Sequence, residues 1–254
     1  MNRILVPTLI AAAVATLSGL AQAAEPESTL AFNAGVVSDY RYRGISQSRL
    51  DAALQGGVDY ADKSGFYVGA WGSTIRWIKD SSTVAVPVKG PFELDLYGGY
   101  KGVAGDLSYD LGFLRYEYVD NTLGKRSPVL VNANTNEVYG ALSYGVFTGK
   151  YSHALSDLFG NPNSRNSSYL DLSATLDLGE GYSLVPHMGY QTVRNTSPDA
   201  SYTDYSLTLG KDLGNGLSAS GALVGTNASK AVYVTPDGKF TGKSSLVLGL
   251  KYSF

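Results

Sequence analysis

Polar and apolar residues alternate one by one along segments of about ten residues, and this pattern limits what the chain can fold into. Over 169–178, leucine or alanine at each even position alternates with tyrosine, aspartate, serine or threonine at each odd position. The segments 92–101, 204–209 and 245–254 follow the same rule with few exceptions. Successive side chains of a strand point to opposite faces, and about ten residues of a tilted strand cross a bilayer. The pattern therefore predicts strands with one face toward lipid and one polar face.

Twelve such strands are expected along the chain, which is an even number. The segment 106–119 is the least regular, because the apolar phase of its first half gives way to Tyr116 and Tyr118. A bulge near Leu114 would explain this change of phase. The predicted strands are 29–42, 51–61, 65–77, 92–101, 106–119, 135–144, 146–155, 167–178, 181–194, 202–213, 216–227 and 243–254.

The connections between these strands alternate between short and long. Short ones fall at 62–64, 102–105, 144–145, 179–181 and 214–216, and long ones near 43–50, 78–91, 120–134, 156–166, 195–201 and 228–242. Short periplasmic turns and longer outer loops are typical of bacterial outer-membrane barrels, whereas a soluble β-sandwich need not keep this rhythm. The predicted fold is an all-β, transmembrane, antiparallel up-and-down β-barrel with both termini on the periplasmic side.

Tyrosines lie at many segment ends, where amphipathic rings form girdles at the two membrane interfaces. The tyrosines expected in these girdles are Tyr40, Tyr42, Tyr60, Tyr100, Tyr118, Tyr144, Tyr182 and Tyr252.

The two ends of the chain carry targeting signals. Arg3 precedes an apolar stretch over 4–20, and Ala21-Gln22-Ala23 is a cleavage site of the kind that signal peptidase accepts. We therefore expect a cleaved signal peptide at 1–23 and a barrel at 24–254, in the outer membrane of a Gram-negative cell after export through the periplasm. The final Phe254, with Tyr252 two residues before it, resembles the C-terminal signal read by the barrel assembly machinery.

Composition excludes several classes of protein. The chain has no cysteine, which excludes disulfides and thiolate metal sites, and its net charge of −2 does not favour a nucleic-acid partner. No phosphate-binding motif or metal-ligand cluster is recognisable, so neither a cofactor nor a metal is expected. His153 and His187 are the only histidines, and nothing in their spacing requires a Ser-His-acid triad. We do not expect an enzyme.

Several segments resemble a known family. They are Val37–Ser46 (VSDYRYRGIS), Ala53–Tyr60 (ALQGGVDY), Gly65–Ser73 (GFYVGAWGS), Glu93–Tyr100 (ELDLYGGY), Asn136–Gly140 (NEVYG) and Tyr169–Leu172 (YLDL). Together they resemble the TorF-type porin family, an uncharacterised family of proteobacterial outer-membrane proteins. The resemblance spans nearly all of 24–254 and implies an outer-membrane location and a role in transport, without a substrate or catalytic residues.

The polar face of the predicted strands carries many ionisable residues, which must pair or meet water because unpaired buried charges are costly. We expect Asp110, Lys150, Asp204 and Lys251 on this face, where eight acids outnumber three bases. An excess of carboxylates in a pore favours cations. The candidate pore-lining residues are Asp39, Arg41, Asp59, Glu93, Asp95, Glu137, Asp171 and His187.

Barrels of about eight strands are filled by side chains, whereas those of roughly 16 to 18 strands hold open channels, so twelve strands predict a narrow lumen at most. The expected function is passive diffusion of small hydrophilic solutes or ions, with a leaning toward cations. The alternatives are a non-conducting receptor, adhesin or structural barrel, and an outer-membrane hydrolase. The expected partners are outer-membrane lipid, lipopolysaccharide and the solutes, while the oligomeric state is left open.

Overall fold

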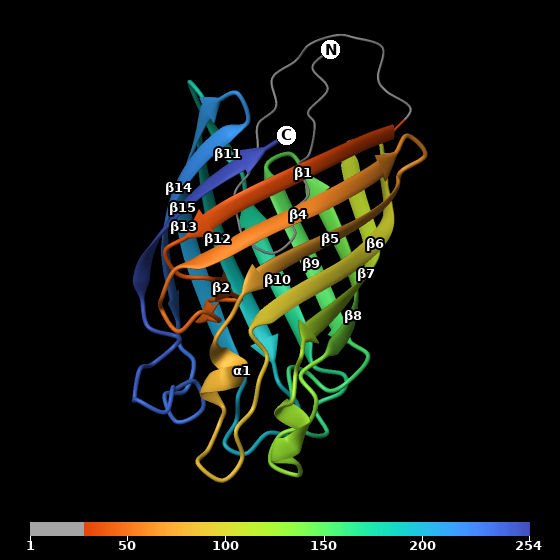
Figure 1. The fold of residues 1–254 in the computed structure, drawn as a ribbon. Coiled ribbons are helices and arrows are strands. Elements are labelled where there is room, and N and C mark those ends of the chain that lie inside the picture. Colours follow the sequence, from red (N-terminus) through yellow and green to blue (C-terminus); the bar gives the residue numbers. More distant parts are fainter. Residues whose placement is uncertain (1–27) are drawn as a thin grey trace.

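The computed structural model describes residues 28–254, and the predicted signal peptide at 1–23 lies outside the described residues. Long tilted strands form a closed β-barrel (Figure 1). The spanning strands are β1 (Ser28–Val37), β4 (Ala53–Asp62), β5 (Phe66–Thr74), β6 (Phe92–Ala104), β7 (Leu107–Val119), β8 (Thr135–Tyr144), β9 (Phe147–Ala154), β10 (Ser168–Ala174) with β11 (Leu176–Gly179), β12 (Tyr182–Thr192), β13 (Tyr202–Gly214), β14 (Leu217–Thr226) and β15 (Ser245–Ser253).

Two of these elements belong to one strand, since β10 and β11 are separated only at Thr175 and both pair with β12. Every strand pairs antiparallel with its neighbours in the chain, and β1 pairs with β15 from Asn33 opposite Ser253 to Val37 opposite Gly249. Because the first and last strands pair, the barrel has no free edge. The predicted antiparallel barrel of twelve strands is confirmed.

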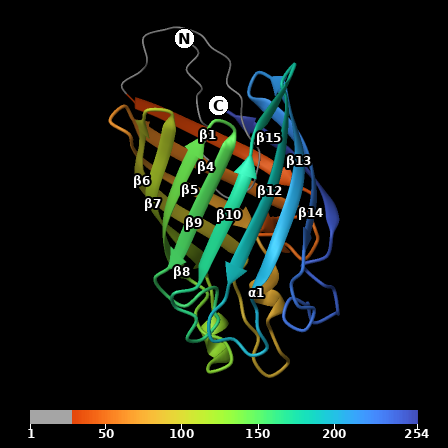
Figure 2. The same cartoon turned by 180° about the vertical axis from the view of Figure 1, so that it is seen from behind.

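The connections divide the barrel into two ends (Figure 2). One end, the short-turn end, carries tight turns such as the one at Asn215 and Gly216, whose φ angles of 52° and 80° suit a two-residue hairpin. Strand β1 begins and β15 ends there. The other end, the long-loop end, carries the long connections, with a short helix α1 (Trp77–Asp80) and a 3₁₀ helix η1 (Leu123–Arg126).

The outer surface of the barrel is apolar. Leu172 and Leu207, near the middle of their strands, are 53% and 45% exposed. A soluble protein rarely exposes so continuous an apolar surface, whereas a lipid-facing barrel requires it. Among residues 28–254, no helix is long and apolar enough to cross a membrane.

The first predicted strand and the loop after it differ from the structure. The expected strand 29–42 ends at Val37, and the expected outer loop 43–50 does not project outward. Residues 38–52 instead turn into the barrel, with the short strands β2 (Arg41–Tyr42) and β3 (Ile45–Ser46) forming a small hairpin there. We call residues 38–52 the inward segment. The other strands match their expected positions within a few residues.

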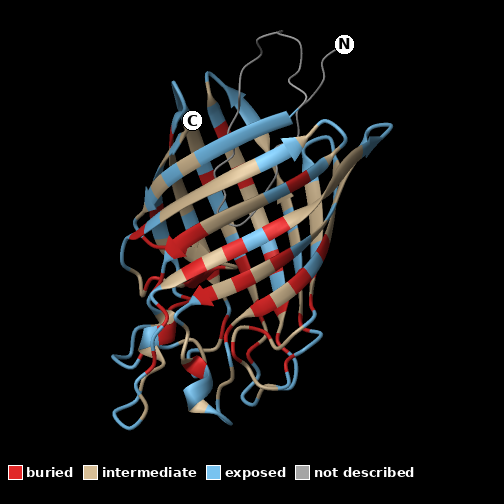
Figure 3. Ribbon diagram, turned by 45° about the vertical axis from the view of Figure 1, so that its right-hand side comes forward, coloured by how far each residue is buried: buried red, intermediate tan, exposed pale blue. Residues whose placement is uncertain are grey.

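The expected bulge near Leu114 is absent from β7, which pairs with β6 and β8 without a register shift. Leu114, Tyr116 and Tyr118 all face the interior and are buried, because the inward segment packs on this part of the wall. The change of phase in the sequence therefore marks an apolar patch on the inner face, not a bulge. Buried residues gather in the long-loop half of the barrel (Figure 3).

Three of the tyrosines expected in the interfacial girdles lie inside the barrel instead, because the inward segment packs there. Tyr60, Tyr144, Tyr182 and Tyr252 are exposed, in agreement with interfacial positions. Tyr40 and Tyr118 are buried inside the barrel instead, and Tyr42 is packed against the same cluster.

Arginine on the lipid face should destabilise the barrel. We expect Leu172→Arg or Leu207→Arg to lower the free energy of unfolding by about 2–4 kcal/mol, because a charge near the bilayer midplane loses its water. Ser206→Arg is the matched control, since Ser206 lines the interior cavity and its replacement should cost far less. Urea unfolding in lipid vesicles measures the difference, and equal losses on both faces would contradict the assigned orientation.

Candidate functional site

The inward segment makes its turn through two residues in the left-handed region, Arg43 at φ 47° and Gly44 at φ 78°. A Cβ on Gly44 would lie 2.5 Å from Thr226 Cγ2 and 2.6 Å from Asp204 Cβ. Only glycine fits here, because the turn both needs a positive φ and touches the inner wall at β13 and β14. The tip of the hairpin thus lies against the β13–β14 part of the wall.

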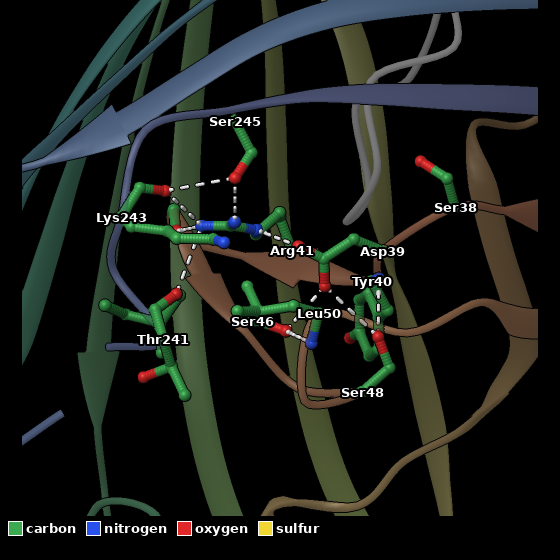
Figure 4. Close-up of polar contacts among 12 residues, drawn as sticks. Ser38, Asp39, Tyr40, Arg41, Ser46, Ser48, Leu50, Thr241, Lys243 and Ser245 are labelled. Atoms are coloured by element: carbon green, nitrogen blue, oxygen red, sulfur yellow. Dashed lines mark hydrogen bonds and ion pairs between the residues drawn. The ribbon is translucent and has the colours of Figure 1, made fainter. Parts of the chain in front are cut away.

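A polar cluster fixes the base of the segment (Figure 4). The Asp39 carboxylate accepts hydrogen bonds from the Ser46 and Ser48 hydroxyls, at 2.5 and 3.2 Å, and pairs with Arg41 Nε at 2.5 Å. The Arg41 guanidinium also donates to the carbonyls of Gly44, Thr241 and Lys243 and to Ser245 Oγ, at 2.9 to 3.1 Å. Arg41 thereby ties the segment to the start of β15.

A second anchor lies at Arg43. Its guanidinium forms a bidentate ion pair with Glu137 of β8, at 2.7 and 3.0 Å, and donates to Gln191 of β12 at 2.6 Å. The same guanidinium lies 4.9 Å from the ring centre of Tyr42 and 4.3 Å from that of Tyr169. Both charged side chains of the ion pair are almost fully buried, so neither is screened by water.

Aromatic contacts complete the attachment. Tyr40 packs edge-on against Trp71 with ring centres 5.4 Å apart, and Tyr42 packs against Tyr116 and Phe159 at 5.6 Å. The hydroxyls of Tyr42 and Tyr116 are hydrogen-bonded. The segment is therefore held by ion pairs on one side and by an apolar cluster on the other.

Two cavities lie on either side of the segment. An inner cavity of about 500 Å³ is lined by Arg41, Arg43 and Gly44 and reaches Val103 and Ser108 at the short-turn end. A second pocket of about 380 Å³ lies among the long loops, where Ser46 and Arg49 of the same segment form part of its wall. The inward segment thus stands between the lumen and the long-loop end.

The inner cavity has mixed charge. Four carboxylates and four basic groups line it, together with His187: Asp39, Asp110, Asp171, Asp204, Arg41, Arg43, Lys101 and Lys150. Lys101 and Lys150 lie over the rings of Tyr67 and Tyr139, at 4.2 and 4.0 Å. Tyr67 donates to Asp110 at 2.6 Å.

These tyrosines lie along the wall because glycines leave room for them. A Cβ on Gly112 would fall 2.4 Å from the Tyr139 hydroxyl and 2.9 Å from that of Tyr67, which are hydrogen-bonded to each other. Gly112 therefore lets the Tyr67 and Tyr139 rings lie close against the inner wall.

The candidate pore-lining residues fall into two groups. Asp39, Arg41, Asp171 and His187 line the inner cavity. The others face inward but do not line it: Asp59, which accepts from Tyr97 at 2.6 Å, Glu137, which pairs with Arg43, and the buried Glu93 and Asp95. Arg43 is not among the residues predicted from the sequence, because the pattern predicts an outer loop at 43–50.

His187 lies between acidic groups of two strands. Its Nε2 is 2.9 Å from Asp171 Oδ2 and 3.2 Å from the Tyr169 hydroxyl, and its Nδ1 is 3.8 Å from Asp204 Oδ1. Ser173 lies opposite His187 in the β10–β12 pairing, but no serine hydroxyl in residues 28–254 is hydrogen-bonded to either histidine. The same residues contain no group of three or more His, Asp or Glu that could hold a metal ion.

Outside the membrane-spanning strands, Arg49 joins two long loops through ion pairs with Asp80 at 3.1 Å and Asp237 at 2.8 Å. Hydrogen bonds from Thr235 and Arg49 lower the pKa of Asp237 to about 2. Burial raises the pKa of Asp80 from its ordinary value.

The fold and the site together define a twelve-stranded β-barrel of the outer-membrane type, with its lumen narrowed by an inward segment. The chain belongs to a family described as "Bacterial protein of unknown function (Gcw_chp)", whose model matches residues 21–254. No curated protein matches the chain.

Two porins of solved structure have a similar fold. The KdgM porin in complex with disordered oligogalacturonate aligns with a TM-score of 0.54 and 9% identity, over 89% of this chain and 99% of that one. The NanC porin aligns with a TM-score of 0.52 and 10% identity, over the same shares of 89% and 99%. At this identity the likeness establishes the fold.

Removing the Arg43 anchor should destabilise the barrel. Arg43→Met leaves Glu137 buried without its partner, so we expect the free energy of unfolding to fall by about 3–5 kcal/mol. The double variant R43M/E137M should recover much of this loss, because it removes both charges. Arg115→Met is the control, since Arg115 pairs with Glu117 on the outer face with both side chains over 30% exposed, and its loss should cost about 1 kcal/mol or less. Equal losses in R43M and R115M, by urea unfolding in micelles, would contradict the role of the anchor.

The Arg49–Asp237 contact should resist mild acid. Because the pKa of Asp237 is lowered to about 2 from an ordinary value of about 4, its stabilising contribution is complete above about pH 4. It is lost as the pH falls toward 2. The thermal midpoint of wild type should therefore exceed that of Asp237→Asn at pH 5 to 7, and the difference should become small near pH 2 and vanish below it. A difference that disappears already at pH 5 would contradict this assignment.

Proposed function

We propose that this chain is an outer-membrane porin that allows passive diffusion of small hydrophilic solutes or ions. The observation that carries the proposal is the inner cavity of about 500 Å³, which is lined by charged and hydroxyl groups and bounded by the inward segment. A structural barrel needs no open interior of this kind, and charged groups that meet water in a pore avoid the cost of dry burial.

The proposal places the short turns in the periplasm and the long loops outside the cell, as outer-membrane barrels generally do. It includes removal of residues 1–23 on export, insertion through the C-terminal signal at Phe254, and contact of the outer face with lipid and lipopolysaccharide. The resemblance to TorF-type porins supports the same role. The inward segment would set the size limit for solutes, with Asp39, Arg41, Asp171 and His187 along the path.

The class of solute is a further part of the proposal. A similar barrel, the KdgM porin, has been solved in complex with oligogalacturonate, so a polar oligosaccharide is one solute of suitable chemistry. The basic groups and tyrosine rings of the inner cavity are compatible with such a ligand. Liposome swelling with sugars of increasing length tests the size limit.

Single-channel recording in planar bilayers tests the proposal. Wild type should pass current, and R41A/R43A should pass a larger current, because both anchors of the inward segment are removed. Arg115→Ala, on the outer face, should leave the conductance unchanged. Absence of current in wild type and in both variants would contradict a porin. Closure on adding a ligand would favour a receptor, and silence with hydrolysis of lipid or peptide would favour an enzyme.

The leaning toward cations stays a prediction. It was based on eight acids against three bases, but the inner cavity carries four of each, and Glu93 and Asp95 do not line it. The reversal potential under a tenfold KCl gradient measures the preference in wild type and in E93Q/D95N. A cation-selective wild type would agree with the prediction, whereas an anion-selective pore would contradict it.

A further inference from the structure

Two carboxylates are buried in the barrel wall behind the inward segment. Glu93 and Asp95 lie two residues apart on the inner face of β6, and their exposed fractions are 1% and 0%. None of their four carboxylate oxygens makes a hydrogen bond of ordinary geometry within residues 28–254, although the Tyr40 and Tyr118 hydroxyls lie close enough to Glu93 to interact with it. Burying an unpaired carboxylate costs several kcal/mol, so this arrangement needs a compensating group.

The inward segment supplies a fifth oxygen at the same place. The hydroxyl of Tyr40 is buried and makes no hydrogen bond of ordinary geometry in the described chain. It is close enough to Glu93 to interact with it, and Glu93 and Asp95 are the charges that act on it most strongly. Because Tyr40 belongs to the inward segment and the acids belong to the wall, these oxygens face one another across the contact between the two.

The surrounding charges do not neutralise the pair. Arg43 is the basic group near Asp95, and its guanidinium is already in a bidentate ion pair with Glu137. Within residues 28–254 neither Glu93 nor Asp95 forms an ion pair, so the two acids leave an excess of two negative charges when both are ionised. A single divalent cation would balance this excess. Calcium and magnesium are hard cations that bind oxygen ligands, and magnesium sites often use only one or two carboxylates.

We propose that Glu93, Asp95 and the Tyr40 hydroxyl bind a divalent cation, Ca²⁺ or Mg²⁺, that joins the inward segment to the barrel wall. The bound ion takes its carboxylate ligands from β6 and its phenol ligand from the segment. Its binding holds Tyr40 against Trp71 and so favours the position of the segment inside the lumen. Loss of the ion leaves two like charges behind the segment and weakens this position.

The two tryptophans of the chain report on this site without labels. Trp71 contacts Tyr40 with ring centres 5.4 Å apart. Trp77 contacts Tyr118 with ring centres 5.3 Å apart, and Tyr118 lies opposite Glu93 in the β6–β7 pairing. The full mature protein, purified in detergent and treated with EDTA, is titrated with CaCl₂ or MgCl₂ alone. Tryptophan emission and the thermal midpoint are recorded in wild type, E93Q/D95N and the control D106N/E180Q, whose two acids lie on exposed short turns.

Wild type and the control should show a saturable change in emission and a rise in thermal midpoint with at least one of the two ions. E93Q/D95N should lose both responses, and without metal it should be at least as stable as metal-free wild type, because the unpaired charges are gone. If E93Q/D95N does not fold, Tyr40→Phe keeps both acids and should weaken the apparent affinity severalfold.

Equal responses in wild type and E93Q/D95N would overturn the proposal. A wild type whose tryptophan emission and thermal midpoint change with neither ion would also overturn it. A thermal midpoint that depends on pH between 5 and 8 but not on either ion would show that the two acids share a proton instead. That result would also overturn the cation site. None of these outcomes depends on whether the barrel conducts.

Discussion

The buried ion pair between Arg43 and Glu137 is the interaction on which the interior of this barrel depends. A chain segment placed inside a barrel must find partners for its own polar groups, because an unpaired buried charge is costly. Arg43 meets this requirement with a bidentate contact to Glu137 and a further hydrogen bond to Gln191. The pair joins the tip of the inward segment to β8 and β12, on the side of the barrel away from β1.

Closure of the strands makes such an interior possible. With β1 paired to β15, the backbone groups of the wall are satisfied among themselves, and the outer face can be apolar while the inner face is polar. The inner face is not uniform, however. Toward the short turns it carries ionisable groups and a cavity, whereas toward the long loops it carries Leu114, Tyr116 and Tyr118 in contact with the inward segment.

The alternation of residues was enough to predict the number of strands and the orientation of most side chains, because a strand with two different environments repeats every two residues. It could not predict the path of 38–52. Asp39 and Arg41 continue the alternation of β1, so the sequence of this inward turn has the same pattern as a longer strand. The available signal was the apolar inner face at Tyr116 and Tyr118, which needs a covering element, and Gly44 at the hairpin tip.

Side-chain roles were harder to predict than positions. Glu93 and Asp95 face inward as expected, but they are buried and do not line the cavity. Their burial depends on Tyr40, which is some fifty residues away in the chain. Arg43 was missed for the same reason, because its partners lie on β8 and β12. Contacts of this kind are set by tertiary packing, and a periodic pattern within one strand contains no information about them.

Residues 38–52 lie inside the barrel, with Ser46 of β3 hydrogen-bonded to Thr241 just before β15, and disulfide trapping tests this placement most directly. The chain has no cysteine, and the 3.0 Å hydrogen bond from the Ser46 amide to the Thr241 carbonyl places the two backbones within disulfide range. In S46C/T241C, mild oxidation should link the two positions, as seen by mass spectrometry of non-reduced tryptic peptides. Two free thiols that are both alkylated after oxidation would contradict the account.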